Sequence, residues 1–293
     1  MKLGGILAFI FRDPTQPLRR VTALLSIVLL LTACTTQAVM QSAVTPLSSD
    51  KYAAIVVDAS SGRVLYESHS RDTRFPASLT KMMTLYMIFE AMDDGRLSRS
   101  SQIPVSAYAA GRPPTKIGFR PGQSIEVESA ILALCVRSAN DVASAVAEHL
   151  GGSEQRFAEM MTAKARQLGM NATTFRNASG LPDAAQRTTA HDMAILSMAL
   201  HKRFPHHYHY FRNRDFTYNG KVIRGHNELV GRVAGVDGLK TGFIRASGYN
   251  LATSASRGGK RIVAVVMGGE SAASRNAHME DLIEYYLPRA AGS

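Results

Sequence analysis

The pattern of apolar and polar positions differs between the ends and the middle of this chain. Near both ends, apolar residues form short runs bounded by turn residues, which is typical of β-strands. Through the middle, apolar residues recur at helical spacing. Short connections join neighbouring predicted strands, which favours antiparallel pairing. The pattern therefore predicts an α+β fold, in which a helical lobe is inserted into an antiparallel β-sheet.

The strand predictions rest on paired apolar runs with turn signals between them. Asn219-Gly220 is the clearest signal, because this dipeptide favours the tight turn of a two-residue hairpin. Hairpins are predicted at residues 52–67, with a turn at 60–62, at residues 216–223, and at the turn 257–260, which follows a strand that carries Lys240.

Six helices are predicted, and one of them is apolar on nearly every face. That helix covers residues 77–92 and ends before Gly95, so we expect it to be buried. Thr189 and Asp192 form a capping signal at the start of a helix that runs to about Arg203. The others are three short helices within residues 127–169, with breaks near 138–141 and 151–152, and one helix at 272–286.

The first 34 residues have the features of an export signal. Arg19 and Arg20 precede an apolar stretch at 21–33, which is short for a membrane span because a transmembrane helix needs about 20 residues. Leu-Thr-Ala-Cys34 resembles the bacterial lipoprotein cleavage box, so Cys34 is a candidate for lipidation and membrane anchoring. Ordinary cleavage nearby, for example after Ala38, is the alternative. Both predict export to the periplasm or cell envelope.

Composition refines this picture only slightly. After a linker at residues 35–51, residues 52–288 are enough to bury the core of one domain. The net charge of +11 favours anionic partners. The basic residues are scattered along the sequence without a nucleic-acid-binding motif, so we expect an anionic cell envelope and not nucleic acid. Cys135 lies in an apolar run and is predicted to be a small buried residue.

Three short motifs carry the candidate chemistry, and they occur in a fixed order. They are Ser78-Leu-Thr-Lys81, Ser138-Ala-Asn140 and Lys240-Thr-Gly242. A second Ser-x-x-Lys at 48–51 and a second Ser-x-Asn at 274–276 show that no single string is specific. Together the three motifs supply a nucleophile with an amine, a hydroxyl with an amide, and a strand that can hold substrate. This combination indicates a serine acyl-transfer site.

The first motif places its two functional side chains on one helix face. Ser78 and Lys81 are three residues apart at a predicted helix start. Serine needs a neighbouring base, and lysine becomes one when burial or a second cation such as Lys240 lowers its pKa. The backbone N–H of Ser78 is a natural half of an oxyanion hole. Taken alone, the motif also fits a capped helix with an exposed lysine.

The second and third motifs suit substrate contact. Ser138 and Asn140 lie at a predicted helix break, where a loop can turn both side chains toward a cleft. The alternative is a Ser/Asn turn that caps a helix starting at Asp141. Gly242 has no side chain, so an extended peptide can lie close to this predicted edge strand and pair with it.

The ordered set resembles the signature of the penicillin-recognising serine enzymes. Within that group the chain is similar to the D-alanyl-D-alanine carboxypeptidases of the low-molecular-mass penicillin-binding type, from about Tyr52 to about Leu287. The resemblance implies a β-lactamase/transpeptidase-like fold, release of the terminal D-alanine from peptidoglycan stem peptides through an acyl-enzyme on Ser78, inhibition by β-lactam antibiotics, and no cofactor. Further similar strings lie at residues 58–66, 179–181, 189–194 and 235–239.

The same resemblance implies roles for residues around the nucleophile. Ser138 would relay the proton from Lys81 to the leaving amine, and Asn140 would bind the substrate backbone. The backbone N–H of Phe243 would complete the oxyanion hole.

The resemblance also implies a carboxylate-binding region. Lys240 and Thr241 would face the terminal carboxylate of the substrate, and Arg275 would be its main clamp, because a guanidinium binds carboxylate in a bidentate manner. A solvated arginine at a helix start is the alternative for Arg275. Ile244 departs from several relatives, which carry a hydroxyl residue there.

Other functions on the same fold have less support. A class A β-lactamase would need a glutamate in a Glu-x-x-Leu-Asn string between the second and third motifs, and this sequence has none. A β-lactam receptor or scaffold would need a membrane-crossing signalling element, for which the residues before the apolar run leave no room. Transpeptidation and endopeptidase activity stay open, because different acceptors and substrates can use the same acyl-enzyme.

A group of three histidines suggests a metal site only superficially. His206, His207 and His209 have no acidic or cysteine partner at helical ligand spacing. We therefore expect a surface segment and no metal site. The sequence also contains no phosphate loop or dinucleotide-binding fingerprint.

Overall fold

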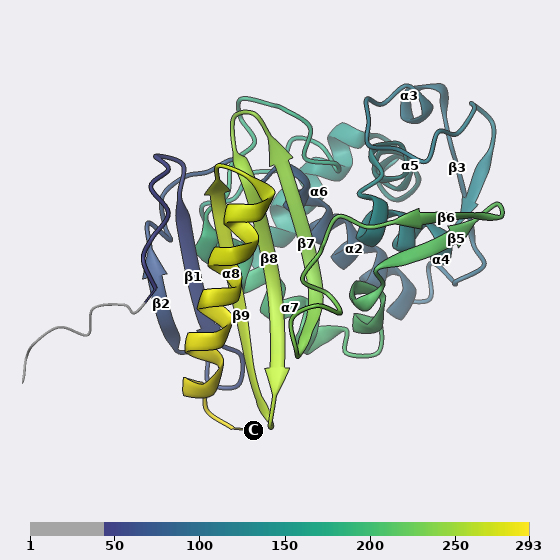
Figure 1. Ribbon diagram of the computed structural model, residues 1–293. Coiled ribbons are helices and arrows are strands. Elements are labelled where there is room, and N and C mark those ends of the chain that lie inside the picture. Colours follow the sequence, from purple (N-terminus) through teal and green to yellow (C-terminus); the bar gives the residue numbers. More distant parts are fainter. Residues whose placement is uncertain (1–43, 293) are drawn as a thin grey trace, which may run out of the picture. The chain divides into compact units, whose positions relative to one another are not determined.

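The computed structural model describes residues 44–292. These residues form an antiparallel sheet with one helix on one face and a helical lobe on the other (Figure 1). The predicted α+β class is confirmed, and the lobe is inserted between the first and last strands of the sheet. The predicted export signal at 1–34 and the candidate lipidation site at Cys34 lie outside the described residues.

The central sheet brings together strands from both ends of the described chain. β1 (Ala53–Asp58) pairs with β9 (Lys260–Gly269), and the strand order is β2-β1-β9-β8-β7. All neighbouring strands are antiparallel. β7 (Val236–Ile244) is therefore an edge strand, as predicted for the Lys-Thr-Gly segment. The other two strands are β2 (Val64–Ser68) and β8 (Gly248–Arg257).

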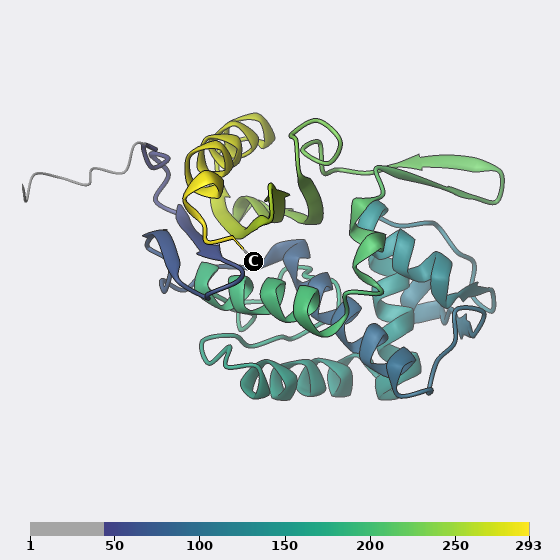
Figure 2. The same ribbon diagram turned by 90° about the horizontal axis from the view of Figure 1, so that it is seen from below.

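Two hydrophobic clusters cover opposite faces of this sheet, because successive side chains of a strand point in opposite directions. In β1, Ile55 and Val57 pack with the helical lobe, whereas Ala54 and Val56 pack with α8 (Ala272–Tyr286). Figure 2 shows the sheet between α8 and the helical lobe. This double cover explains why β1 is buried along its whole length.

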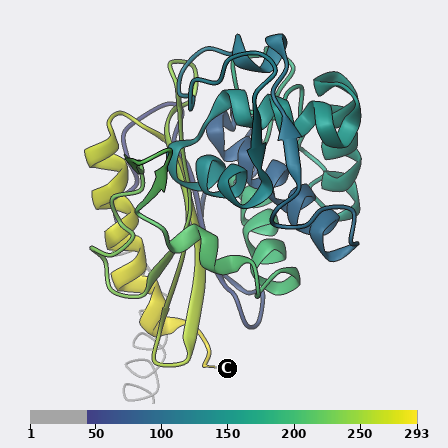
Figure 3. The ribbon, with the colours of Figure 1, turned by 90° about the vertical axis from the view of Figure 1, so that its right-hand side faces the viewer.

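The helical lobe is built around α2 (Lys81–Asp93), which packs against several other helices of the lobe. Ten of its thirteen residues are buried, so apolar residues are needed on nearly every face. Figure 3 shows the helices of the lobe on the side of the sheet opposite α8. The main helices around α2 are α4 (Val127–Leu132), η2 (Ala133–Arg137), α5 (Asn140–Gly151), α6 (Glu154–Gln167) and α7 (Ala190–Arg203).

The predicted helix boundaries are confirmed with one difference. Ser138 (φ 61°) and Gly152 (φ 77°) adopt left-handed backbone conformations at the two predicted breaks. Thr189 accepts a hydrogen bond from the Asp192 amide at the start of α7. The predicted helix at 77–92 differs at its start, because Ala77–Thr80 forms a 3-10 turn (η1) before α2 begins.

Short elements complete the described fold. The hairpin predicted around Asn219-Gly220 is present as β5 (Asp215–Tyr218) and β6 (Lys221–Arg224). The strands β3 (Gln102–Pro104) and β4 (Ser124–Glu126) have three residues each, too few to show a periodic pattern in the sequence. The remaining short elements are α3 (Ala107–Ala110), η3 (Tyr208–Arg212) and η4 (Leu287–Arg289).

Cys135 packs against the core of the helical lobe as a partly buried side chain, and burial raises the pKa of its thiol. Both observations agree with the small hydrophobic role predicted for it. Within residues 44–292, no helix combines the length and the apolar character that crossing a bilayer requires.

Candidate active site

A cleft of about 500 Å³ lies between the edge strand β7 and the helical lobe. Residues of all three motifs line it, together with Arg275 from the first turn of α8. Lys81 and Lys240 are buried and are not among the lining residues. The lining residues that the sequence singled out are Ser78, Ser138, Asn140, Thr241, Gly242, Phe243, Ile244 and Arg275.

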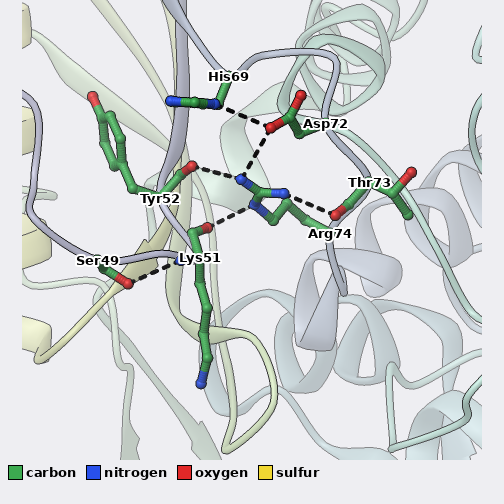
Figure 4. A network of polar contacts seen from close by, with 7 residues as sticks. All are labelled: Ser49, Lys51, Tyr52, His69, Asp72, Thr73 and Arg74. Atoms are coloured by element: carbon green, nitrogen blue, oxygen red, sulfur yellow. Dashed lines mark hydrogen bonds and ion pairs between the residues drawn. The ribbon is translucent and has the colours of Figure 1, made fainter.

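The chain segment that leads to Ser78 is held at its start by Arg74 (Figure 4). The Arg74 guanidinium donates to the carbonyl oxygens of Lys51 (2.8 Å) and Tyr52 (2.9 Å), which precede β1. Asp72 lies 3.5 Å from the same guanidinium and 3.1 Å from His69. These contacts fix the loop before η1 against the sheet.

Asn250 of β8 fixes the same segment closer to Ser78. Its fully buried side chain donates to the carbonyl oxygens of Phe75 (3.0 Å) and Pro76 (3.1 Å), and it accepts from the Gly268 amide (3.0 Å). The sequence motifs give no signal for Asn250, because its partners lie 174 and 175 residues away. It connects the segment that carries Ser78 directly to the sheet.

Lys81 lies below Ser78 and is fully buried. Its Nζ is 3.4 Å from Ser78 Oγ, 2.7 Å from Asn140 Oδ1 and 2.6 Å from the carbonyl oxygen of Ser179. Burial, reinforced by the positive charge of Lys240, lowers the pKa of Lys81 well below its ordinary value. The alternative of an exposed lysine is therefore wrong, and Lys81 has the environment of a general base.

Lys240 occupies a second buried cation position beneath the cleft. Its Nζ donates to the carbonyl oxygen of Thr241 (2.8 Å). Burial lowers the pKa of Lys240 to about 7. Thr241 and Gly242, the next residues of β7, line the cleft. In this arrangement the charge of Lys240 affects Lys81, as predicted. The Lys240 side chain is buried, however, whereas it was expected to face the substrate.

The second motif presents an unpaired hydroxyl in the same cleft as Ser78. Within the described residues, the buried Ser138 Oγ has no hydrogen-bond partner, which is costly unless a partner arrives during the reaction. Asn140 accepts from Lys81 and donates to the carbonyl oxygen of Pro113 (3.0 Å). The N-cap of α5 is Ala139, and no side chain caps that helix. The alternative helix-capping role of the motif is therefore wrong.

Gly242 allows β7 to approach Ser78 closely. A Cβ atom at this position would lie 3.0 Å from the amide nitrogen of Ser78 and 3.2 Å from the carbonyl oxygen of Pro76. Such contacts would force the strand away from η1. The next residue, Phe243, is half exposed at the cleft, and its ring packs on Tyr249 with the centroids 4.3 Å apart.

Arg275 is buried rather than solvated, so the alternative of an exposed helix-start arginine is wrong. Its Nη1 donates to the Asn250 carbonyl (3.0 Å), and its Nε and Nη2 donate to Asn276 Oδ1 (3.0 and 2.7 Å). Asn276 in turn donates to Glu228 (2.9 Å). Burial lowers the pKa of Arg275 to about 10, so the side chain stays charged at neutral pH. Sequence reasoning assigned no role to Asn276, whose Ser-x-Asn string was set aside, or to Glu228, which belongs to no motif and lies 48 residues from Asn276.

Basic residues gather in a groove beside the cleft, although they are scattered in the sequence. Five of them line this groove, and none of its lining residues is acidic. Three are chain neighbours of residues that line the cleft, so the two surfaces adjoin. We call this surface the basic groove; its cations are Lys116, Arg120, Arg137, Lys221 and Arg224.

Comparisons with known proteins agree with this geometry. The family model described as D-alanyl-D-alanine carboxypeptidase matches residues 39–271. D-alanyl-D-alanine carboxypeptidase DacF of Bacillus subtilis is 33% identical over 244 residues, covering 82% of this chain and 62% of the relative. DacA of Escherichia coli is 34% identical over 243 residues, covering 80% and 60%. The chain thus spans about three fifths of the length of these relatives.

The similar solved structures are also carboxypeptidases or penicillin-binding proteins. D-alanyl-D-alanine carboxypeptidase DacD from Francisella tularensis superposes with a TM-score of 0.81 at 29% identity, covering 85% of this chain and 72% of that one. Penicillin-binding protein D2 from Listeria monocytogenes, in an ampicillin-bound form, gives a TM-score of 0.71 at 32% identity, covering 82% and 97%. The fold predicted from the resemblance is confirmed, and the chain belongs to the D-alanyl-D-alanine carboxypeptidase family of serine peptidases.

Proposed function

We propose that this protein is a serine carboxypeptidase that removes the terminal D-alanine from peptidoglycan stem peptides. One observation carries the proposal beyond family membership. A buried lysine with a lowered pKa lies within hydrogen-bond reach of Ser78 Oγ, at the floor of a cleft that also presents a charged arginine. A serine, a neutral amine and a carboxylate receptor are the groups that this reaction needs.

In acylation, the neutral Lys81 amine accepts the proton of Ser78 as Oγ attacks the carbonyl carbon before the last D-alanine. The negative charge that develops on the carbonyl oxygen is stabilised by the backbone N–H groups of Ser78 and Phe243. The C–N bond then breaks, and the proton passes from Lys81 through the Ser138 hydroxyl to the departing amine. The unpaired Ser138 Oγ supports this relay.

In deacylation, water attacks the ester carbonyl of the acyl-enzyme. Lys81, neutral again after the first step, accepts the proton of that water. The C–O bond to Ser78 breaks, and the proton returns to Oγ. The shortened stem peptide leaves with a new terminal carboxylate, and the enzyme is restored.

Arg275 is the candidate receptor for the terminal carboxylate of the substrate. It lines the cleft and is held by Asn250 and Asn276 in a fixed orientation, so little side-chain entropy is lost on binding. The Thr241 hydroxyl would donate a hydrogen bond to the same carboxylate, while Lys240 below supplies positive charge in its protonated form. Asn140 and Gly242 would contact the substrate backbone.

We also propose that the protein acts in the cell envelope. The basic groove supports an anionic polymer as partner, since peptidoglycan stems carry carboxylates. β-Lactams would acylate Ser78; the ampicillin-bound Listeria protein of this fold supports their binding. We propose an exported protein with a catalytic domain at 52–288, a signal at 1–34 and a lipid anchor on Cys34.

The test is D-alanine release from a diacyl-Lys-D-Ala-D-Ala peptide by the full-length protein, compared with Ser78→Ala. We expect release by the first protein only, and labelling of the first protein only by fluorescent penicillin. If penicillin labels the native protein on Ser78 but no D-alanine is released, the protein is a receptor or a transpeptidase and not a carboxypeptidase. Many turnovers of nitrocefin per minute would instead indicate a β-lactamase.

A further inference from the structure

We propose that Asp93, His206 and His207 form a binding site for a divalent transition-metal ion, with Zn²⁺ as the best match. The site lies at the end of α2 opposite to Lys81, so it is separate from the candidate active site. It has no part in the reaction proposed above. Its consequence is structural: an ion here connects two parts of the fold that flank the cleft.

The three side chains converge from segments far apart in the sequence. Asp93 is the last residue of α2, whereas the two histidines lie in the turn between α7 and η3. The Nε2 atom of His206 is 2.8 Å from Asp93 Oδ1, and that of His207 is 3.1 Å from the same oxygen. One ligand atom from each residue lies within 4.8 Å of the others. The expected surface segment is wrong, because His207 and the aromatic residues that follow it are buried. The sequence argument considered partners at helical spacing only, whereas Asp93 comes from another helix.

The donor set and its spacing fit zinc. Two imidazoles and one carboxylate are ligands that Zn²⁺ commonly takes, at distances of about 2.0–2.2 Å. Ligand atoms around a tetrahedral ion at those distances are about 3.4 Å apart. The separations of 2.8 and 3.1 Å between these side chains are close to that value, so small side-chain rotations admit an ion. The half-exposed His206 leaves space for water as a fourth ligand.

His207 is already held in a fixed orientation. Its ring stacks on Phe89 with the centroids 4.9 Å apart and an angle of 20° between the planes, and its side chain is only 8% exposed. Among the described residues, its buried Nδ1 has no hydrogen-bond partner. The Nε2 atom of the same ring is hydrogen-bonded to Asp93, so this contact fixes the direction in which Nε2 points. A ring fixed in this way loses little entropy when it binds an ion.

The charge at this end of α2 also favours a cation. Asp93 and Asp94 are adjacent at the C-terminus of the helix, where the helix dipole is negative. The last turn of α2 contains no basic residue, and Arg96 pairs with Asp94 rather than with Asp93 (3.1 Å). A divalent ion at Asp93 would offset both the carboxylate and the helix end.

An ion at this position would connect α2 with the segment that supports β7. η3 follows His207 directly and packs against β7. A Cβ atom on Gly238 would lie 2.7 Å from Cβ of Phe211, so this packing is close. Gly238 is two residues before Lys240, while α2 begins with Lys81. The ion would thus stabilise the position of α2, which carries Lys81, relative to β7, which carries Lys240.

The test uses the untagged full-length protein, stripped of metal with EDTA and dialysed. We expect one Zn²⁺ to bind by titration calorimetry, an increase of several degrees in the unfolding temperature, and visible absorption of the tetrahedral type with Co²⁺. Asp93→Asn and His206→Gln should each weaken Zn²⁺ binding at least tenfold and remove the Co²⁺ absorption. His149→Gln is the matched control, since this exposed histidine of α5 is outside the cluster, and should change neither.

Two results would overturn the proposal. One is the absence of Zn²⁺ binding and Co²⁺ absorption in the native protein. The other is binding that His149→Gln weakens as much as His206→Gln does, because this would indicate unspecific histidine contacts. Circular dichroism of each metal-free variant separates loss of the site from loss of the fold. Penicillin labelling of Ser78 should persist in all variants and in EDTA, so failure of this site leaves the proposed function untouched.

Discussion

Asn140 Oδ1 accepts a hydrogen bond of 2.7 Å from Lys81 Nζ. This bond connects the second motif to Lys81, the candidate general base in the first motif. The side chain of Asn140 also donates to the Pro113 carbonyl, so the amide orientation is fixed from both ends. A neutral amide oxygen holds the amine without adding negative charge, whereas a carboxylate in its place would favour the protonated amine. The residue type at position 140 therefore bears on the pKa of Lys81.

This relationship leads to a prediction for Asn140→Asp. The new carboxylate would raise the pKa of Lys81 and keep it protonated at neutral pH. We expect acylation by a fluorescent penicillin to slow by about 10²-fold or more at neutral pH, the usual scale for loss of a general base. The rate should recover partly as the pH rises. The measurement is the second-order acylation rate as a function of pH.

Asn140→Ala is the matched control, because it removes the same hydrogen bond without adding charge. Its acylation rate should fall, but its pH profile should stay closer to that of the native protein. Identical pH profiles for the two variants would contradict a role of residue 140 in setting the charge of Lys81.

The two buried lysines predict a second effect on pH dependence. Burial first, and then the charge of Lys240, lower the pKa of Lys81. Since acylation needs the neutral amine, its rate should rise as the pH increases through this lowered pKa. Lys240→Met removes the neighbouring cation, so the pKa of Lys81 should increase and the rise in rate should move to higher pH. Lys240→Arg, which keeps the charge, should move it less. An unchanged profile in Lys240→Met would show that burial alone sets the pKa.

Arg275 leads to a prediction about substrate selectivity. Arg275→Ala should lower kcat/KM for a peptide ending in D-Ala-D-Ala by about 10- to 150-fold, because hydrogen bonds to a charged group contribute about 1.5–3 kcal/mol. A peptide that ends in D-Ala-D-alaninamide lacks the carboxylate, so its turnover should change much less. The comparison is made by measuring release of the last residue from both peptides. Equal losses for both would mean that Arg275 supports the structure of the cleft without selecting a carboxylate.

The sequence predicted the motif residues of this cleft better than it predicted what holds them. Ser78, Ser138 and Gly242 could be assigned to one cleft because each motif has a local chemical signature. Asn250 and Glu228 have no such signature, since their partners come from distant segments. Their contributions follow from tertiary contacts and appear only once the sheet and α8 are assembled.

The same limit applies to two side-chain clusters that the sequence did not predict. Asp93 lies 113 residues from His206, so a search at helical ligand spacing did not find this contact. The five cations of the basic groove come from separate segments, and only folding places them on one surface. Backbone elements were more predictable, because α2 and the hairpins depend on local patterns and turn residues.

The basic groove predicts a dependence on substrate charge. Lys221 and Arg224 are exposed residues of β6 on this groove. Replacing both with glutamine should lower kcat/KM several-fold for soluble peptidoglycan fragments that carry several carboxylates, because a basic surface raises the local concentration of anions. A short diacyl-Lys-D-Ala-D-Ala peptide should be affected little. D-alanine release from both substrates at low and high salt measures the effect, which salt should reduce.

A control with the same loss of charge separates the groove from the net charge of the protein. Arg71→Gln combined with Lys202→Gln removes two exposed cations outside the groove. If the charged surface next to the cleft guides the polymer, this variant should keep the native kcat/KM on both substrates. An equal loss in the control would mean that overall charge, and not the groove, attracts the polymer. A loss on the short peptide as well would place Lys221 and Arg224 close to the reacting bond, because that substrate is too short to need a surface beyond the cleft.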